Sequence, residues 1–240
     1  MTVLVGGRAP REWSAQVKDF VRERYTHLAS AHAYPPGGRA RAREAGYPPV
    51  WVDALPERVA GAYCGCGYAL EGVDLAGVRL AVDLGCGAGL DARLLAERLG
   101  GRVLAVDFSL AALRRAREAA GGIPLAGDME RLPIRDGAAD LVLANASLNL
   151  TVDKAAALAE AARILRPGGR LVAREMVRAG ALPPEIARDP SAWNASLGGV
   201  PEEEEWRALV LRVGFAQVRI SHHRPFAPVT AVRIEAVKAG

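Results

Sequence analysis

The feature that most constrains this chain is the stretch at residues 80–91, where an apolar run ends in an acid and continues into a glycine-rich turn. The apolar run predicts a buried strand, and the leucines after the turn recur at the spacing of a helix. Glycines in the turn let a ligand lie directly against the backbone, because no Cβ blocks its approach. Asp83 stands at the carboxyl end of the strand, where open α/β sheets bind ligands. The stretch therefore predicts a ligand site.

The spacing of the glycines narrows the kind of ligand. Gly85, Gly87 and Gly89 give G-x-G-x-G, which differs from the G-x-G-x-x-G of dinucleotide sites. A dinucleotide places its pyrophosphate at the start of the helix, where Asp83 would repel it. S-adenosylmethionine carries a sulfonium, an amino group and a ribose but no phosphate, so Asp83 can bind its amino group directly or through water. We therefore expect S-adenosylmethionine here.

From residue 79 onward, apolar runs alternate with amphipathic helical patterns, which predicts a parallel sheet with helices on both faces. Ser109 and Asp153 stand where helix N-caps are expected. The last two strands are expected to form an antiparallel hairpin. The expected strands are 79–84, 102–107, about 122–126, 139–145, 170–177, 215–221 and 229–237, and the expected helices are 89–99, 109–120, about 153–166 and 202–213.

The part of the chain before this pattern has a different character. Residues 12–30 carry apolar side chains at helical spacing. This helix has three open roles, to cap a substrate pocket, to pair with another subunit or to cover the sheet, and we favour the last. Residues 31–50, rich in Pro, Gly and Arg, are expected to be a solvated loop, and residues 51–62 a short helix. We therefore divide the chain into a helical N-terminal extension on the substrate side, 1–69, and an α/β domain, 70–240.

Composition narrows the classes of partner. Half of the residues are hydrophobic, which is enough for a sizeable core, and no apolar run approaches the ~20 residues of a membrane span. No signal-peptide core stands at the start, and three cysteines cannot build a disulfide scaffold. The net charge of +4 is weak support for a nucleic-acid partner. We expect a cytoplasmic monomer or homodimer that acts on a small molecule rather than on nucleic acid or a membrane.

Further candidate cofactor residues follow the later strands. Asp107 ends the second strand, where a carboxylate can accept both ribose hydroxyls. Phe108 is placed to stack on the adenine, with packing at the strand end as the alternative. Asp128 can accept from the adenine amine, and the backbone of Met129 can meet the ring edge. Asn145, at the end of the fourth strand, is expected to face the methionine part of the cofactor.

These residues belong to motifs that resemble those of the class I S-adenosylmethionine-dependent methyltransferases: V-D-L-G-C-G-A-G at 82–89, G-D-M-E-x-L-P at 127–133 and L-R-P-G-G-R-L at 165–171. The resemblance implies a Rossmann-like, mostly parallel seven-stranded sheet whose last strand is antiparallel. It also implies methyl transfer from S-adenosylmethionine. Gly85 and Gly87 would contact the cofactor through their backbone, and Cys86 would be a structural part of the same cofactor loop.

Other segments resemble the arsenite methyltransferases: Y-P-P-V at 47–50, G-C-G at 65–67, N-A-S-L-N-L at 145–150 and D-P-x-x-W at 189–193. That resemblance implies that thiolates from three regions hold trivalent arsenic. The first region contains Cys66, the second has Ala146 at the matching position, and the third reads Trp193-Asn194-Ala195-Ser196. Two of the three regions therefore lack the cysteine of the family.

The missing cysteines bear on the acceptor, because soft As(III) needs soft ligands, which a methyl or hydroxyl group does not supply. Cys64 and Cys66 point to opposite faces of an extended stretch unless the turn at Gly65 brings them together. We therefore predict a methyltransferase with an altered substrate site for a small organic molecule. Three alternatives stay open: metalloid methylation through Cys64 and Cys66, a non-catalytic S-adenosylmethionine-binding protein, and an RNA methyltransferase that uses the arginines at 39–43.

The expected reaction is a direct SN2 transfer, in which the enzyme positions the acceptor in line with the S–CH3 bond. A hydroxyl or amine acceptor would also need a base, and the sequence identifies none. The four histidines show no metal-ligand spacing and no nucleophile partner. The candidate pocket residues are Tyr63, Cys66, Asn145, Asn149, Glu175 and Trp193, of which Cys66, Asn149 and Glu175 are the catalytic candidates.

Overall fold

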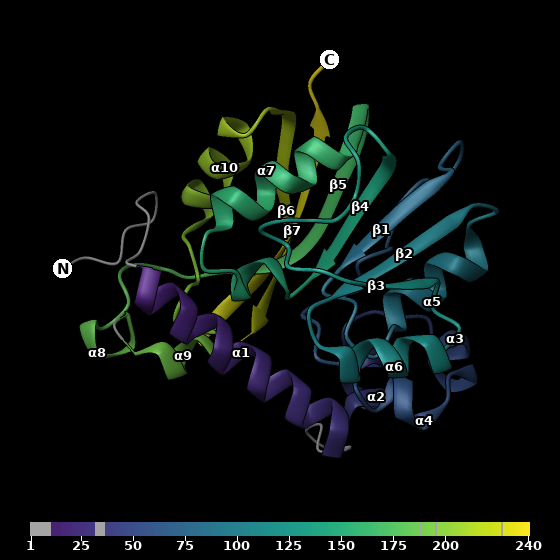
Figure 1. Cartoon of the computed structure of the whole chain (residues 1–240), viewed down its shortest axis with the longest axis horizontal. Coiled ribbons are helices and arrows are strands. Elements are labelled where there is room, and N and C mark those ends of the chain that lie inside the picture. Colours follow the sequence, from purple (N-terminus) through teal and green to yellow (C-terminus); the bar gives the residue numbers. More distant parts are fainter. Residues whose placement is uncertain (1–10, 32–36, 188, 195, 227) are drawn as a thin grey trace.

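The computed structural model describes residues 11–31, 37–187, 189–194, 196–226 and 228–240 (Figure 1). These residues form a seven-stranded sheet in the order β3-β2-β1-β4-β5-β7-β6. Strands β1 to β5 pair in parallel, and β7 is antiparallel to both of its neighbours. This confirms the predicted Rossmann-like class. The strands are β1 (Leu80–Leu84), β2 (Arg102–Asp107), β3 (Ile123–Ala126), β4 (Ala139–Asn145), β5 (Leu165–Val177), β6 (Phe215–Phe226) and β7 (Val229–Lys238).

Helices cover both faces of the sheet, because successive side chains of a strand point to opposite sides. In β1, Ala81 packs in one apolar core and Val82 in the other. The core around Ala81 also contains residues of the N-terminal extension. The core around Val82 also contains buried side chains of β5 and β7. The helices on the first face are α5 (Leu90–Arg98) and α6 (Leu110–Glu118), and those on the second are α7 (Lys154–Ile164) and α10 (Glu203–Arg212) (Figure 1).

Two predicted N-caps are confirmed and set where helices begin beside the site. The Ser109 hydroxyl accepts from the amide of Ala112 at 3.3 Å, and the Asp153 carboxylate accepts from the amide of Ala156 at 2.9 Å. Both residues follow strand ends on either side of β1, where the strand order reverses. In α/β sheets, ligands bind in the crevice at such a reversal.

The N-terminal extension is more helical than expected. The loop predicted at 31–50 was wrong in part, because residues 38–44 form the helix α2 (Gly38–Glu44). Residues 32–36 lie outside the described residues. Arg39 and Arg41 donate to backbone carbonyls of the turns that follow, so their side chains fix the extension instead of extending into solvent. Tertiary packing therefore outweighs the local Pro, Gly and Arg composition.

The helix predicted at 51–62 is two short helices, α3 (Pro49–Ala54) and α4 (Glu57–Ala60). The break falls at Leu55, whose ψ of 141° is extended. Leu55 precedes Pro56, and the ring of a proline keeps the residue before it out of the helical region. The prediction of one continuous helix was wrong for this reason.

The first helix, α1 (Arg11–Ala31), does not cover a face of the sheet. It lies across the edge where the parallel strands end, packed against α6 and against α9 (Pro190–Asn194), which follows α8 (Pro184–Ala187) (Figure 1). The position of α1 matches the alternative in which it caps a pocket. None of the helices in the described ranges is both long and apolar enough to cross a membrane.

Candidate functional site

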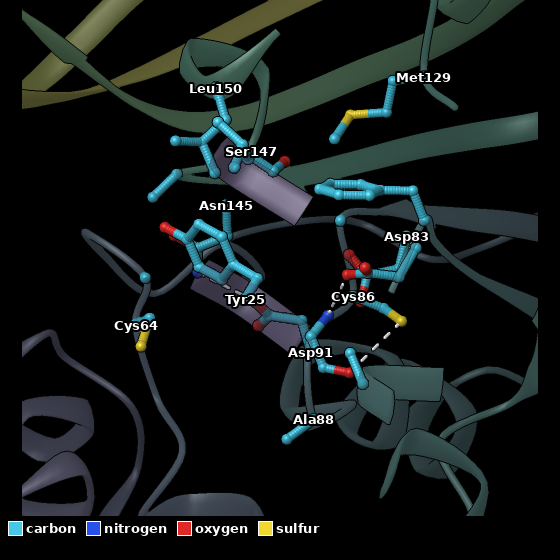
Figure 2. Close-up of a pocket in the computed structure, with 18 of the residues that line it drawn as sticks. Tyr25, Cys64, Asp83, Cys86, Ala88, Asp91, Met129, Asn145, Ser147 and Leu150 are labelled. Atoms are coloured by element: carbon cyan, nitrogen blue, oxygen red, sulfur yellow. Dashed lines mark hydrogen bonds between the residues drawn. The ribbon is translucent and has the colours of Figure 1, made fainter. Parts of the chain in front are cut away.

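A cavity opens where β1, β2 and β4 end, and α1 contributes one of its walls (Figure 2). Its volume of about 150 Å³ is roughly ten times the space that a single buried water needs. The residues predicted to bind the cofactor come from four strand ends, those of β1 to β4, and the fold brings them to this one cavity. All of them line it: Asp83, Gly85, Cys86, Gly87, Asp107, Phe108, Asp128, Met129 and Asn145.

Asp107 is buried at the end of β2 and holds the glycine loop. One carboxylate oxygen accepts from the amide of Gly87 at 3.0 Å, and the other accepts from the amide of Ser109 at 2.8 Å. A carboxylate has about four acceptor sites, so both oxygens keep capacity for a ligand. Burial raises the pKa of Asp107, and the hydrogen bonds from Ser109 and Gly87 oppose that rise.

Asp83 carries a buried oxygen atom that has no partner. Its side chain is 2% exposed, and its Oδ2 has no hydrogen-bond partner among the described residues. Burial raises the pKa of Asp83 well above its ordinary value, and the charges of Asp91 and Asp107 raise it further. An unpartnered buried acceptor is costly, and a cationic donor in the cavity would satisfy it. A cation in the cavity would favour the ionised form of Asp83, whereas a phosphate would disfavour it.

The three glycines of the loop serve different purposes, although all have positive φ. A Cβ on Gly85 would lie 2.4 Å from the Cβ of Ser147, and a Cβ on Gly89 would lie 2.9 Å from the Cα of Ala116. A Cβ on Gly87 would meet nothing within 4 Å. Close packing therefore requires Gly85 and Gly89, whereas the backbone of Gly87 is open to the cavity.

At another part of the cavity, Lys18 of α1 joins two acids that follow β3. Its Nζ lies 2.7 Å from Asp128 and 2.6 Å from Glu130. Burial lowers the pKa of Lys18, but the hydrogen bonds to the two acids outweigh burial and raise it overall. Glu130 also accepts from the amides of Val152 and Asp153. The sequence analysis missed Lys18, because a lysine on an amphipathic helix carries no motif.

The side chain of Asn145 is engaged by the protein itself. Its Nδ2 donates to the Tyr47 hydroxyl at 3.0 Å, to the Gly67 carbonyl at 2.9 Å and to Asp91 at 2.9 Å. Its Oδ1 accepts from the amide of Cys66 at 3.0 Å, and Tyr47 donates to Asp91 at 2.7 Å. Asn145 thus ties the extension to β4. The roles of Tyr47 and Asp91 were missed, although Tyr47 opens the Y-P-P-V motif and Asp91 closes the stretch at 80–91.

The extension supplies another wall of the cavity, with Tyr25 from α1 and Cys64 from the segment before β1 (Figure 2). Tyr63, next to Cys64, lines the same wall. Cys64 is exposed and lines the cavity, whereas Cys66 is 2% exposed and does not. This is the opposite-face arrangement of an extended stretch. Burial raises the pKa of Tyr25 to about 12, and the nearby Cys64 adds to the shift, so the phenol is protonated at neutral pH.

Cys66 belongs to an apolar cluster behind that wall. Ala146 and Leu197, the neighbour of Ser196, pack against the same cluster, whose buried members are Cys66, Met176, Val200, Val229 and Ala231. Burial raises the pKa of the Cys66 thiol, and the charge of Glu175 raises it further. The three regions in which the arsenite methyltransferases place cysteines therefore meet here around one thiol, which is protonated at neutral pH.

Three other predicted pocket residues also lie behind the cavity wall. Asn149 and Glu175 are completely buried, Trp193 is 4% exposed, and none of them lines the cavity. Trp193 packs edge-on against Trp13 of α1, with 5.0 Å between the ring centroids. Glu175 contacts the loop after β4 instead of the cavity. The structure therefore gathers these residues, but not at the surface where a ligand would lie.

Comparisons with known proteins agree with this geometry. The family described as "Methyltransferase domain" matches residues 82–173. An arsenite methyltransferase of Aquipseudomonas alcaligenes is 31% identical over 75% of this chain and 57% of its own length. A demethylmenaquinone methyltransferase of Mycolicibacterium vanbaalenii is 33% identical over 58% of this chain and 68% of its own length.

Among solved structures, an arsenic(III) S-adenosylmethionine methyltransferase from Chlamydomonas reinhardtii superimposes with a TM-score of 0.67 at 25% sequence identity. The match covers 86% of this chain and 74% of the other. The chain spans about half the length of the curated arsenite methyltransferases that it matches.

Proposed function

Because the chain belongs to the class I S-adenosylmethionine-dependent methyltransferases, we propose that it transfers a methyl group from S-adenosylmethionine to a small organic acceptor. The observation that carries the proposal is the cavity where β1, β2 and β4 end, with two buried carboxylates beside the glycine loop. The acceptor would occupy the part of this cavity walled by Tyr25, Tyr63 and Cys64.

The residues present fit the cofactor. The unpartnered oxygen of Asp83 offers a buried acceptor for an amino group, and the free acceptor capacity of Asp107 suits ribose hydroxyls. Phe108 and Met129 supply apolar surface for an adenine, and the open backbone at Gly87 allows close approach. Asp128 would reach an adenine amine only in competition with Lys18, which already contacts it.

When bound, S-adenosylmethionine supplies an electrophilic methyl group on its sulfonium. The contribution of this chain is to hold the acceptor and to exclude water, since SN2 transfer gains most from proximity and desolvation. The network of Tyr47, Asp91 and Asn145 fixes one wall, and α1 closes another with Val21 and Tyr25. We assign no general base.

The remodelled thiol region supports an acceptor other than inorganic arsenite. Of the three matching regions only one offers a thiol, Cys66, and burial keeps it protonated in an apolar cluster. Cys64 lines the cavity, so the two thiols of the extension do not converge there. The alternative of metalloid methylation through both thiols would require the segment at 64–66 to rearrange. The arginines at 39–43 make contacts within the extension, which disfavours the alternative of an RNA substrate.

The experiment that tests the proposal is calorimetric titration of the reduced protein with S-adenosylhomocysteine and, separately, with arsenite. We expect clear binding of S-adenosylhomocysteine and none of arsenite, and then turnover in a screen of small thiols, amines and phenols. Absence of S-adenosylhomocysteine binding would sink the cofactor assignment. Tight arsenite binding that disappears in Cys66→Ser would restore the arsenic alternative. Cofactor binding with no turnover on any acceptor would favour a non-catalytic S-adenosylmethionine-binding protein.

A further inference from the structure

The loop between β4 and α7 forms a wall of the cavity. Ala146, Ser147, Leu150 and Thr151 line it, and residues 148–150 make a single 3-10 turn, η1 (Leu148–Leu150). Ala146 has a φ of +56°, a left-handed conformation that few residues other than glycine adopt. Such a conformation persists only when surrounding contacts enforce it. The loop therefore needs an anchor.

One anchor is the carboxylate of Glu175, which is completely buried in β5. One of its oxygens accepts from the amides of Ser147 at 3.0 Å and Leu148 at 2.8 Å, and the other accepts from the amide of Asn149 at 3.3 Å. Three successive amides thus converge on one anion. Hydrogen bonds to a charged acceptor are stronger than those between neutral groups. Glu175 therefore fixes the amide side of the loop.

The second anchor is Lys154, the first residue of α7, which holds the carbonyl side of the same loop. Its buried Nζ donates to the carbonyls of Asn149 at 2.9 Å and Thr151 at 3.0 Å. It also lies 5.1 Å from the centroid of the Trp193 ring, a distance at which a cation and an aromatic face attract each other. Trp193 in turn packs against Trp13 of α1. Lys154 thereby links the loop to the helix that closes the cavity.

We propose that Glu175 and Lys154 are positioning residues, which together hold the 146–151 loop in the conformation that shapes the acceptor part of the cavity. The inference rests on the proposed function for the meaning of that cavity. Stability alone is a weak explanation for two buried opposite charges at this place, because well-packed apolar residues can often replace buried charges without loss. The charges instead satisfy the polar groups of one particular loop conformation. Neither side chain touches the cavity, so neither is assigned a chemical step.

The test is hydrogen–deuterium exchange of the 146–151 segment in Glu175→Gln and Lys154→Met, with Glu185→Gln, an exposed glutamate, as the matched control. In Glu175→Gln we expect the protection factors of the amides in this segment to fall about tenfold, which is the effect of one charge-assisted hydrogen bond. The loss of protection at 146–151 should exceed any loss of global stability measured by urea unfolding at pH 8. Retained protection, or a loss that merely follows global stability, would overturn the proposal. Should Glu175→Gln fail to fold, Lys154→Met decides by the same criteria.

The pH dependence gives a second readout that a purely structural role would not move. Burial raises the pKa of Glu175 to about 7, and burial lowers the pKa of Lys154 to about 8. Protection in the wild type, corrected for intrinsic exchange, should be greatest between these values, where Glu175 is ionised and Lys154 is protonated. Cys66 also faces Glu175, and Glu130 and Asp153 also face Lys154. Glu175→Gln should abolish the fall in protection at lower pH, and Lys154→Met should abolish the fall at higher pH. A pH dependence that persists unchanged in both variants would contradict the assignment.

The same protein preparations separate this inference from the proposed function. Calorimetry with S-adenosylhomocysteine reports on the cofactor assignment alone, and its failure in the wild type would end the proposed function while the exchange pattern still decides the role of the two residues. With an acceptor that the wild type methylates, we expect Glu175→Gln to raise the acceptor KM about tenfold and to weaken the binding of S-adenosylhomocysteine by less, since only Ser147 of this loop packs against Gly85. An unchanged acceptor KM would count against positioning.

Discussion

The two parts of the cavity are built in different ways. The part that we propose binds the cofactor, called the cofactor part, lies where strands end, so Asp83, Asp107 and the glycine loop sit on rigid elements close to a short sequence motif. The part that we propose binds the acceptor, called the acceptor part, is assembled from α1, the segment before β1 and the loop after β4, which are far apart in the sequence. A motif can define the first part, whereas only tertiary structure defines the second. Substitutions in the two parts should therefore separate cofactor binding from acceptor binding.

The largest expected effect is at the cofactor part. Asp107→Ala removes a carboxylate that accepts from the amides of Gly87 and Ser109 and, in the proposed function, from two ribose hydroxyls. Two charge-assisted hydrogen bonds are worth about 4 kcal/mol, so we expect roughly a thousandfold weaker binding of S-adenosylhomocysteine by calorimetry. Asp136→Asn, at a side chain that is 81% exposed, is the control and should bind as the wild type does. A loss below tenfold would remove Asp107 from the cofactor site.

The gathering of the predicted cofactor residues in one cavity was predictable, and the reason is physical. In a parallel sheet the carboxyl ends of neighbouring strands meet at one edge, so Asp83, Asp107 and Asn145 could be placed together from the strand pattern alone. The N-caps at Ser109 and Asp153 followed from side-chain chemistry in the same local way. The contacts of Asn145 could not be predicted, because its partner Tyr47 lies 98 residues earlier in the chain.

Most of the acceptor part could not be predicted, because it too depends on contacts between residues far apart in the sequence. Cys66, Asn149 and Trp193 lie in motifs that resemble the arsenite methyltransferases, and Glu175 lies in the fifth predicted strand, yet the burial of all four depends on tertiary packing. Lys18 and Tyr25 lie on the inner side of an amphipathic helix, and periodicity does not say which surface that side meets. The α2 helix formed against its composition because its arginines find backbone carbonyls in later turns.

Tyr47→Phe should weaken the wall on the acceptor side and spare the cofactor part. The substitution removes the hydroxyl that donates to Asp91 and accepts from Asn145, which leaves buried polar groups unpaired. We expect a loss of about 2 kcal/mol in the free energy of unfolding by urea, and faster reaction of Cys64 with a thiol reagent. The control is Tyr68→Phe, since the Tyr68 hydroxyl contacts Arg98 instead of this network. Equal losses of unfolding free energy in both variants would show that the Tyr47 network stabilises the protein no more than the Tyr68–Arg98 contact does.

The apolar cluster around Cys66 offers a gain-of-function test of the altered acceptor site. Ala146 and Ser196 stand at the positions where the resemblance places cysteines, and both have positive φ, as the new cysteines would. In Ala146→Cys/Ser196→Cys we expect arsenite binding to strengthen roughly tenfold or more, because soft As(III) prefers thiolate ligands. Calorimetry with arsenite measures it, and Ala146→Ser/Ser196→Ala is the matched control. No gain in the cysteine variant would mean that the cluster differs from the arsenic site of the relatives in more than its ligands.

The smallest expected effect concerns Lys18, which joins the two parts by tying α1 to acids of the cofactor part. Its side chain is 32% exposed, and pairs of this kind contribute at most about 1 kcal/mol because water and salt screen them. Lys18→Met should therefore speed the dissociation of S-adenosylhomocysteine by only about threefold in stopped-flow measurements. The wild-type rate should rise with salt and the variant rate should not, because salt screens the ion pair that the variant lacks. A slower release in Lys18→Met would mean instead that Lys18 competes with the cofactor for Asp128, which would make it part of the cofactor site and not a tie between the two parts.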